Sequence, residues 1–319
     1  MLFFAHLLVS KNKAGRSKIM KKIVAIVGGI IVAVLARNIL VSTQQANIHS
    51  FAQWCQQKSS MFSDSTIDRT IDVLLQKADT TDCQVADARL RNVTQLDLDV
   101  KQIKNLKPLS SLINLTSLNL RGNAIEDLQP LTSLMKLKNL NLDENQISNV
   151  NALVGLTNLT NLNLSHNQKL SDISALANLK NLTNLEIEST HQISDITSLS
   201  RLTNLRVLVL NSNQIGNIQP LAGLTNLTDL DLRANQISDI KPLARLTRLT
   251  NLMLNRNQIS DVSSLVGSIH LKNIKLSENK ITDIKPLASL TELTELEIRS
   301  NPIDVKDCPV KTAKCVFAF

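Results

Sequence analysis

The chain has 319 residues, a formal net charge of +8, 43% hydrophobic residues and only 2% aromatic residues. Seven positive charges lie within residues 1–46, which contain no Asp or Glu, so the remainder is close to neutral at +1. Single-stranded nucleic acids are bound by basic grooves with stacking aromatic side chains. The composition beyond residue 46 indicates neither feature, and we expect no nucleic-acid ligand.

Residues 1–46 have the composition of a targeting segment. Lys21 and Lys22 precede an apolar run at residues 23–36, IVAIVGGIIVAVLA, as in a signal peptide. Under this interpretation residues 1–19 are an upstream start that is not translated, and the mature chain is secreted or reaches the periplasm or envelope of a bacterium. The alternatives are an outward-facing membrane anchor through residues 23–41 and, as a third choice, a buried core helix.

Residues 47–89 lack the repeat that follows. Ile67, Ile71 and Leu74 recur at helical spacing, and Asp64 is among the residues able to cap the start of this helix. A solenoid exposes apolar surface at its first coil, so we expect this segment to be a helical N-terminal cap. Its aromatic residues are predicted to pack inside that cap: Phe51, Trp54 and Phe62.

Residues 90–303 contain ten units, nine of 22 or 23 residues, of which the first is degenerate, and a tenth that is cut short. In Leu224–Arg245, apolar residues fall at offsets of 0, 3, 6, 8, 13, 16 and 19, and the frame returns 22 residues earlier and later. This period predicts a leucine-rich repeat. The expected fold is an α/β solenoid: a curved right-handed coil with a parallel concave β-sheet and a 3₁₀ or irregular convex side, where Pro recurs at offset 18.

Asparagine recurs at offset 11, where the chain turns. An inward amide carries both a donor and an acceptor, so it can satisfy backbone groups of adjacent coils that would otherwise be buried without partners. The predicted ladder consists of Asn123, Asn145, Asn167, Asn213, Asn235, Asn257, Asn279 and Asn301. Thr190 replaces Asn in the fifth unit. The fourth and fifth units are one residue longer, which either presents His166 and His191 as a binding feature or is ordinary variation in loop length.

Four cysteines lie outside the repeats. Cys55 and Cys83 are in the N-terminal cap, and Cys308 and Cys315 are in residues 304–319, the predicted C-terminal cap. In an exported chain this distribution favours two local disulfides, although three connectivities are possible. A zinc site is the alternative, but neither pair has CxxC spacing.

The units resemble those of the internalin-type leucine-rich-repeat proteins of bacteria, whose repeat runs LxxLxxLxLxxNxIxDIxPL. The helical N-cap and the terminal NPIDVKDCPVKTAKCVF are also similar to capping segments of secreted relatives. The resemblance implies protein binding through the concave sheet. Relatives that bind host receptors carry aromatic residues on this face, whereas the matching positions here carry none.

Residues at offsets 5, 7 and 9 are predicted to project from the concave strands. The early coils present mostly Asn. In later coils a small apolar group, Val207, Val209 and Met253, is surrounded by polar residues. The candidate ligand-binding residues are Glu186, Glu188, Val207, Val209, Asn211, Asp229, Asp231, Arg233 and Met253. A solvated sheet face without a ligand is the alternative.

The sequence offers no catalytic pattern. Its histidines form no triad or metal spacing, so we expect no enzyme activity, no cofactor and no metal. The leading hypothesis is an exported, monomeric module that binds a protein or glycan. The alternatives are a structural envelope protein without a dedicated ligand and a cytoplasmic regulatory subunit of a phosphatase-like partner. A charge reversal such as Asp231→Lys would distinguish binding from a purely structural role.

Overall fold

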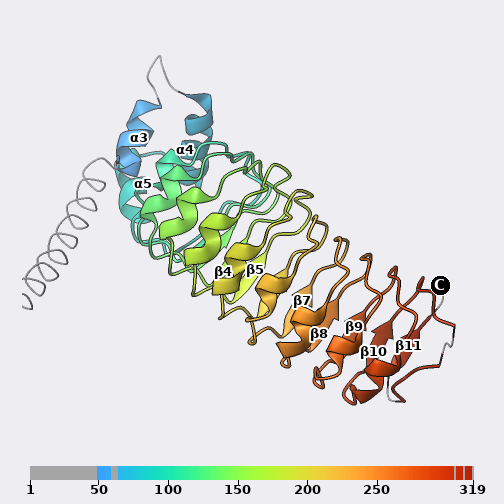
Figure 1. The fold of residues 1–319 in the computed structure, drawn as a ribbon. Coiled ribbons are helices and arrows are strands. Elements are labelled where there is room, and N and C mark those ends of the chain that lie inside the picture. The colour runs from blue at the N-terminus through green and yellow to red at the C-terminus, as the bar shows by residue number, and fades with distance from the viewer. Residues whose placement is uncertain (1–48, 59–63, 305–306, 312, 318–319) are drawn as a thin grey trace, which may run out of the picture. The chain divides into compact units, whose positions relative to one another are not determined.

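The computed structural model describes residues 49–58, 64–304, 307–311 and 313–317, which belong to one compact unit, His49–Phe319 (Figure 1). The predicted targeting segment at residues 1–46 and the predicted cap residue Phe62 lie outside the described residues. Within the described ranges, no helix is both long enough and apolar enough to cross a membrane.

Each repeat contributes one short strand to a parallel sheet whose strands pair in chain order. Equivalent residues of successive repeats face each other, as Leu208 faces Leu230. The strands are β1 (Gln95–Asp97), β2 (Ser117–Asn119), β3 (Asn139–Asn141), β4 (Asn161–Asn163), β5 (Asn184–Glu186), β6 (Val207–Val209), β7 (Asp229–Asp231), β8 (Asn251–Met253), β9 (Asn273–Lys275), β10 (Glu295–Glu297) and β11 (Lys314–Val316). The predicted solenoid is confirmed.

Short 3₁₀ helices form the convex side. They are η1 (Lys107–Leu109), η2 (Gln129–Ser133), η3 (Asn151–Gly155), η4 (Ser174–Asn178), η5 (Thr197–Arg201), η6 (Gln219–Leu221), η7 (Lys241–Arg245), η8 (Ser263–Leu265) and η9 (Lys285–Ser289). In five of them Pro occupies the first turn, for example Pro220 in η6. Proline is tolerated there because the first N–H groups of a helix have no partner within it.

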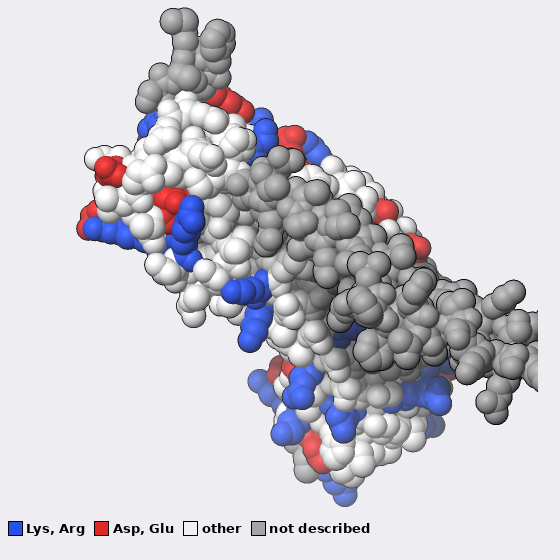
Figure 2. Space-filling model, turned by 90° about the vertical axis from the view of Figure 1, so that its left-hand side faces the viewer, with Lys and Arg blue, Asp and Glu red and all other residues white. Residues whose placement is uncertain are grey.

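The repeat leucines and isoleucines fill the interior of the coil. All seven apolar positions of Leu224–Arg245 are at most 2% exposed, from Leu224 at 0% to Ile240 at 2%. Lysine and arginine side chains stand on the outside of the coils (Figure 2). Each coil covers the apolar face of its neighbour, which is how a solenoid acquires a continuous core.

The ladder asparagines bond to the backbone of two coils at once. Asn235 Nδ2 donates to the carbonyls of Leu210 (3.0 Å), Leu232 (3.1 Å) and Arg233 (3.2 Å), while its Oδ1 accepts from the N–H of Ile215 at 3.0 Å. In the fifth coil the Thr190 hydroxyl lies 2.5 Å from Asn213 Oδ1, so at this step a side chain takes the place of the backbone N–H.

A left-handed residue precedes the ladder position in every coil. The residue at offset 10 has a positive φ throughout, including Val100 (52°), Gly122 (63°), Glu144 (54°) and Arg256 (58°). Only glycine adopts this region without a steric penalty, yet it occupies the position once. The turn geometry is therefore imposed by the stacked coils rather than by local sequence.

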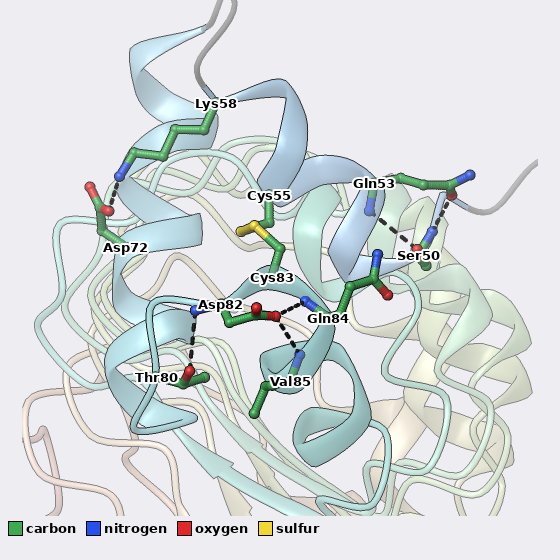
Figure 3. The surroundings of a disulfide bond; sticks show 10 residues. All are labelled: Ser50, Gln53, Cys55, Lys58, Asp72, Thr80, Asp82, Cys83, Gln84 and Val85. Carbon is green, nitrogen blue, oxygen red and sulfur yellow. Dashed lines mark hydrogen bonds and ion pairs between the residues drawn. A yellow bond between two sulfur atoms is a disulfide. The ribbon is translucent and has the colours of Figure 1, made fainter.

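Three helices build the N-terminal cap: α3 (Phe51–Gln57), α4 (Ser65–Lys77) and α5 (Cys83–Leu90). Asp64 caps α4, as expected among the candidates, by accepting from the N–H of Thr66 at 2.8 Å. Phe51 is fully buried and Trp54 packs against the core. A disulfide joins Cys55 of α3 to Cys83 at the start of α5 (Figure 3).

The C-terminal cap adds the eleventh strand, which the repeat pattern does not predict. Lys314 pairs with Glu295 of β10, and Cys315 is bonded to Cys308. Both predicted disulfide pairings are thus present in the structure. The strand escapes notice in the sequence because residues 314–316 lack the repeat frame, and only the pairing with β10 makes them a strand.

Candidate ligand-binding face

The sheet register brings the predicted ligand-binding residues onto four neighbouring strands, β5 to β8. Glu186, Val209, Asp231 and Met253 face one another in one row. Val207 and Asp229 form the adjacent row, and Glu188, Asn211 and Arg233 follow two residues after their strands. In each strand the central leucine faces the core, so its two neighbours project from the opposite, concave side.

Asp231 and Arg233 form a tight ion pair on this face. Arg233 Nε lies 2.9 Å and 3.0 Å from the two carboxylate oxygens of Asp231, and Nη2 lies 2.6 Å from Oδ2. The hydrogen bond to Asp231 raises the pKa of Arg233, with further contributions from the charges of Asp231, Glu188 and Glu297. Asp231 is only 8% exposed, so Asp231→Lys would disrupt the fold locally and is unsuitable as a test of binding.

Glu186 and Glu188 form no ion pair with any described residue, although the charge of Glu188 acts on Arg233 from a distance. Glu186 accepts a hydrogen bond from Asn163 Nδ2 at 2.8 Å. Burial raises the pKa of Glu186, and the charges of Glu188 and Asp143 raise it further. The centre of the concave face is thus acidic, and a bound cationic group would stabilise the ionised carboxylates. The aliphatic side chains of Val207 and Val209 lie beside them.

A hollow of about 300 Å³ lies on the concave face of β2 to β5 and meets the predicted site at Glu186. Its polar lining residues were not among the predicted binding residues, although their repetition at offsets 5 and 7 was visible in the sequence: Ser117, Asn119, Asn139, Asn141, Asn161, Asn163 and Asn184. The oxygens of Asn119, Asn141 and Asn163 each accept from a backbone N–H two residues later, at 2.9–3.2 Å. The nitrogens of Asn119 and Asn163 donate to the carboxylates of Asp97 and Glu186, each at 2.8 Å, which leaves the nitrogen of Asn141 available at the hollow.

Next to this hollow, Asp143 binds two cationic or titratable side chains. His166 Nδ1 lies 2.8 Å from Asp143 Oδ1, and Arg121 Nε lies 3.2 Å from Oδ2. Arg121 Nη2 also lies 3.1 Å from Glu144, whose hydrogen bond raises the pKa of Arg121. His166 is thereby engaged within the chain.

His191 lies elsewhere, at the site where the ladder is interrupted. It lines a hollow of about 480 Å³ with Thr190, Gln168, Gln192 and Gln214. The Gln214 amide donates to the His191 carbonyl at 2.6 Å. The hollow is polar and does not include His166, so the longer coils do not assemble a histidine pair. Among the described residues, no group of three or more His, Cys, Asp or Glu is placed to hold a metal ion.

Comparisons with known proteins agree with this architecture. The family model described as Leucine Rich repeats (2 copies) matches residues 157–201, 180–223, 203–245 and 225–267, and the model described as Leucine rich repeat matches residues 113–168. A search of curated proteins finds no match.

Among solved structures, the internalin InlF of Listeria monocytogenes is 35% identical with a TM-score of 0.74, and the match covers 78% of this chain and 74% of InlF. Internalin C2 of the same species is 36% identical with a TM-score of 0.61, covering 65% of this chain and 91% of that one. A leucine-rich-repeat protein of Leptospira interrogans shares the fold at 23% identity and a TM-score of 0.58, with 73% and 74% covered. The repeat, the caps and the likeness to InlF together show that the chain belongs to the internalin-type family of bacterial leucine-rich-repeat proteins.

Proposed function

We propose that this chain is an exported, non-enzymatic binding protein that captures a protein ligand through the concave face of β5 to β8. The observation that supports this most directly is the pair of carboxylates, Glu186 and Glu188, which form no ion pair with any described residue. The nearby cation of Arg233 is committed to Asp231. The expected ligand presents a Lys or Arg next to an aliphatic side chain, which would fit against Val207 and Val209.

The two disulfides support export. Disulfides persist in oxidising compartments and are rare in the cytosol, so Cys55–Cys83 and Cys308–Cys315 weigh against a cytoplasmic regulatory subunit. We further propose residues 1–46 as the targeting segment, 47–89 and 304–319 as caps, and 90–303 as the binding array. Intact mass with and without reduction before alkylation tests this. Four thiols that are alkylated without reduction would contradict export.

The binding experiment compares the chain coupled to beads with its Glu186→Gln/Glu188→Gln variant, using detergent-solubilised surface proteins and a glycan array as probes. The control is Asp261→Asn/Asp283→Asn, which removes two exposed charges from loops outside the concave face. Capture that is lost in the first variant and retained in the control is expected. Capture that both variants retain would mean that the ligand binds elsewhere and would contradict the proposal, whereas no capture at all would favour a structural envelope protein without a dedicated ligand.

A glycan ligand is the second candidate, supported by the asparagine-lined hollow of β2 to β5. Amide nitrogens such as those of Asn139 and Asn141 can donate hydrogen bonds to sugar hydroxyls. Asn139→Ala/Asn141→Ala should abolish glycan capture while leaving protein capture through Glu186 and Glu188 unchanged. If Asn139→Ala/Asn141→Ala leaves glycan capture unchanged, the glycan candidate is wrong.

A further inference from the structure

The edge of the solenoid that leads from each 3₁₀ helix into the next strand is strongly basic. We define this entry flank as the last three residues of each repeat together with the first five residues of the next, for example Leu243–Arg245 and Leu246–Thr250. From Leu90 to Thr291 it contains no Asp or Glu. The composition of the repeats is almost neutral, so this segregation of charge becomes visible only when residues are sorted by their position in the coil. The expectation that the repeats carry no basic stripe is therefore wrong.

Most cations of the entry flank are exposed and unpaired. Six of them form neither an ion pair nor a side-chain hydrogen bond with any described residue: Lys138, Lys180, Arg201, Arg206, Arg245 and Lys272. The others are engaged, since Lys136 and Arg248 donate to asparagine side chains and Arg91 pairs with Asp87. Outside the flank, Arg121, Arg233 and Arg256 bind carboxylates of their own or the adjacent coil.

The same flank carries most of the exposed apolar side chains. Of the seven large hydrophobic residues that stand exposed in the described chain, five lie here: Ile113 (41%), Met135 (47%), Val154 (44%), Val266 (47%) and Ile269 (47%). They form two groups, one on the second and third coils and one on the eighth and ninth. The unpaired cations of the fifth to seventh coils, including Lys180 and Arg206, lie between them.

Cations interspersed with exposed aliphatic side chains match the chemistry of an anionic lipid surface. The cations would meet headgroup phosphates, and the aliphatic groups would enter the boundary between headgroups and acyl chains. Because parallel strands are about 4.8 Å apart, the seven coil steps from Ile113 to Ile269 form a band roughly 34 Å long. Nucleic acid fits less well, because residues 90–303 offer no aromatic side chain for base stacking.

We propose that the entry flank docks this solenoid on the surface of an anionic membrane. In this orientation the plane of the sheet is roughly perpendicular to the membrane surface. The acidic concave face with Glu186 and Glu188 stays open to solvent. Docking places the binding face beside the membrane without using any of its residues. The proposal is independent of which ligand the concave face takes.

The experiment reads the position of the flank directly. The full chain is reconstituted with vesicles of phosphatidylcholine, with or without phosphatidylglycerol, after Val154→Cys or Val266→Cys is labelled with an environment-sensitive fluorophore. The native cysteines are all in disulfides and are not labelled. Ser238→Cys, an exposed position beyond the strands, is the control label. A blue shift at 154 and 266, restricted to anionic vesicles and absent at 238, is expected.

A second arm tests the charges. Lys180→Gln/Arg201→Gln/Arg206→Gln should lower the equilibrium constant for docking about 100-fold, because each cation near an anionic surface contributes roughly a factor of five. The matched control, Lys104→Gln/Lys169→Gln/Lys280→Gln, removes the same net charge from exposed positions off this flank and should have little effect. Equal effects of the two triple variants, a shift that is the same in neutral vesicles, or no shift at 154 and 266 would each overturn the proposal. An unshifted label on a chain that still binds anionic vesicles through the three cations would show adsorption by charge alone, without entry of the aliphatic side chains, and would also overturn the proposal.

Discussion

The asparagine ladder makes a prediction about stability that follows from individual hydrogen bonds. Asn235→Ala removes three donated bonds and one accepted bond. The carbonyls of Leu210 and Leu232 keep a second ladder partner, Asn213 and Asn257 respectively. The N–H of Ile215 forms no other hydrogen bond with a described residue, so one buried donor is left without an acceptor. An unsatisfied buried group costs about 1–3 kcal/mol, and the weakened carbonyl bonds bring the expected loss to about 2–4 kcal/mol.

Urea unfolding followed by far-UV circular dichroism measures this loss, with an unchanged m-value as the sign that the same structure unfolds. The matched control is Asn226→Ala. Asn226 also spans two coils, donating to Thr203 O at 2.9 Å, but it does so at the surface, where water replaces the lost bond. We expect a loss of at most about 0.5 kcal/mol there. Equal losses at Asn235 and Asn226 would refute the argument that burial makes the ladder costly to break.

Three further predictions follow from the backbone, the charges and the caps. Val100 is a β-branched residue at φ 52°, so Val100→Gly should raise the free energy of unfolding by about 1 kcal/mol in thermal melts. Gly122→Val, at φ 63°, should lower it. A lower stability of Val100→Gly would contradict the inferred strain. Burial raises the pKa of Glu186, so its ionised form destabilises the fold at a pH above that pKa. Glu186→Gln should therefore raise the free energy of unfolding at pH 7, and this increase should shrink as the pH falls through that pKa. An increase that does not change with pH would contradict the argument. Cys55→Ser/Cys83→Ser should cost about 3 kcal/mol in urea unfolding, because the loop of the unfolded chain is no longer closed, and no change would show that the cap does not need the bond.

The fold could be predicted from the sequence alone because the same pattern of apolar residues recurs in each repeat. A leucine at offsets 0, 3, 6 and 8 is buried in one coil for the same reason as in the next, so one unit such as Leu224–Arg245 predicts all of them. The strands, the short convex helices and the inward asparagines follow from that frame. The cysteine pairs followed from their confinement to the two caps.

Other features could not be read from the repeat frame, and two of them depend on contacts between neighbouring strands or turns. Val100 takes a left-handed conformation because the stacked turns demand it, not because of its own preference. Asp231 looked available for a ligand, but its carboxylate is held by Arg233 two residues later. The strand at Lys314–Val316 exists only through its pairing with β10.

The charge pattern shows this division most clearly. Linear composition averages Lys180 and Arg206 with the acids of the concave face and returns a nearly neutral repeat region. Coiling the chain with a period of 22 or 23 residues sends each repeat position to its own side of the molecule, so unpaired cations and exposed aliphatic groups gather on the entry flank while Glu186 and Glu188 lie on the concave face. The sequence determined the coil, and the tertiary structure decided which side chains share a surface.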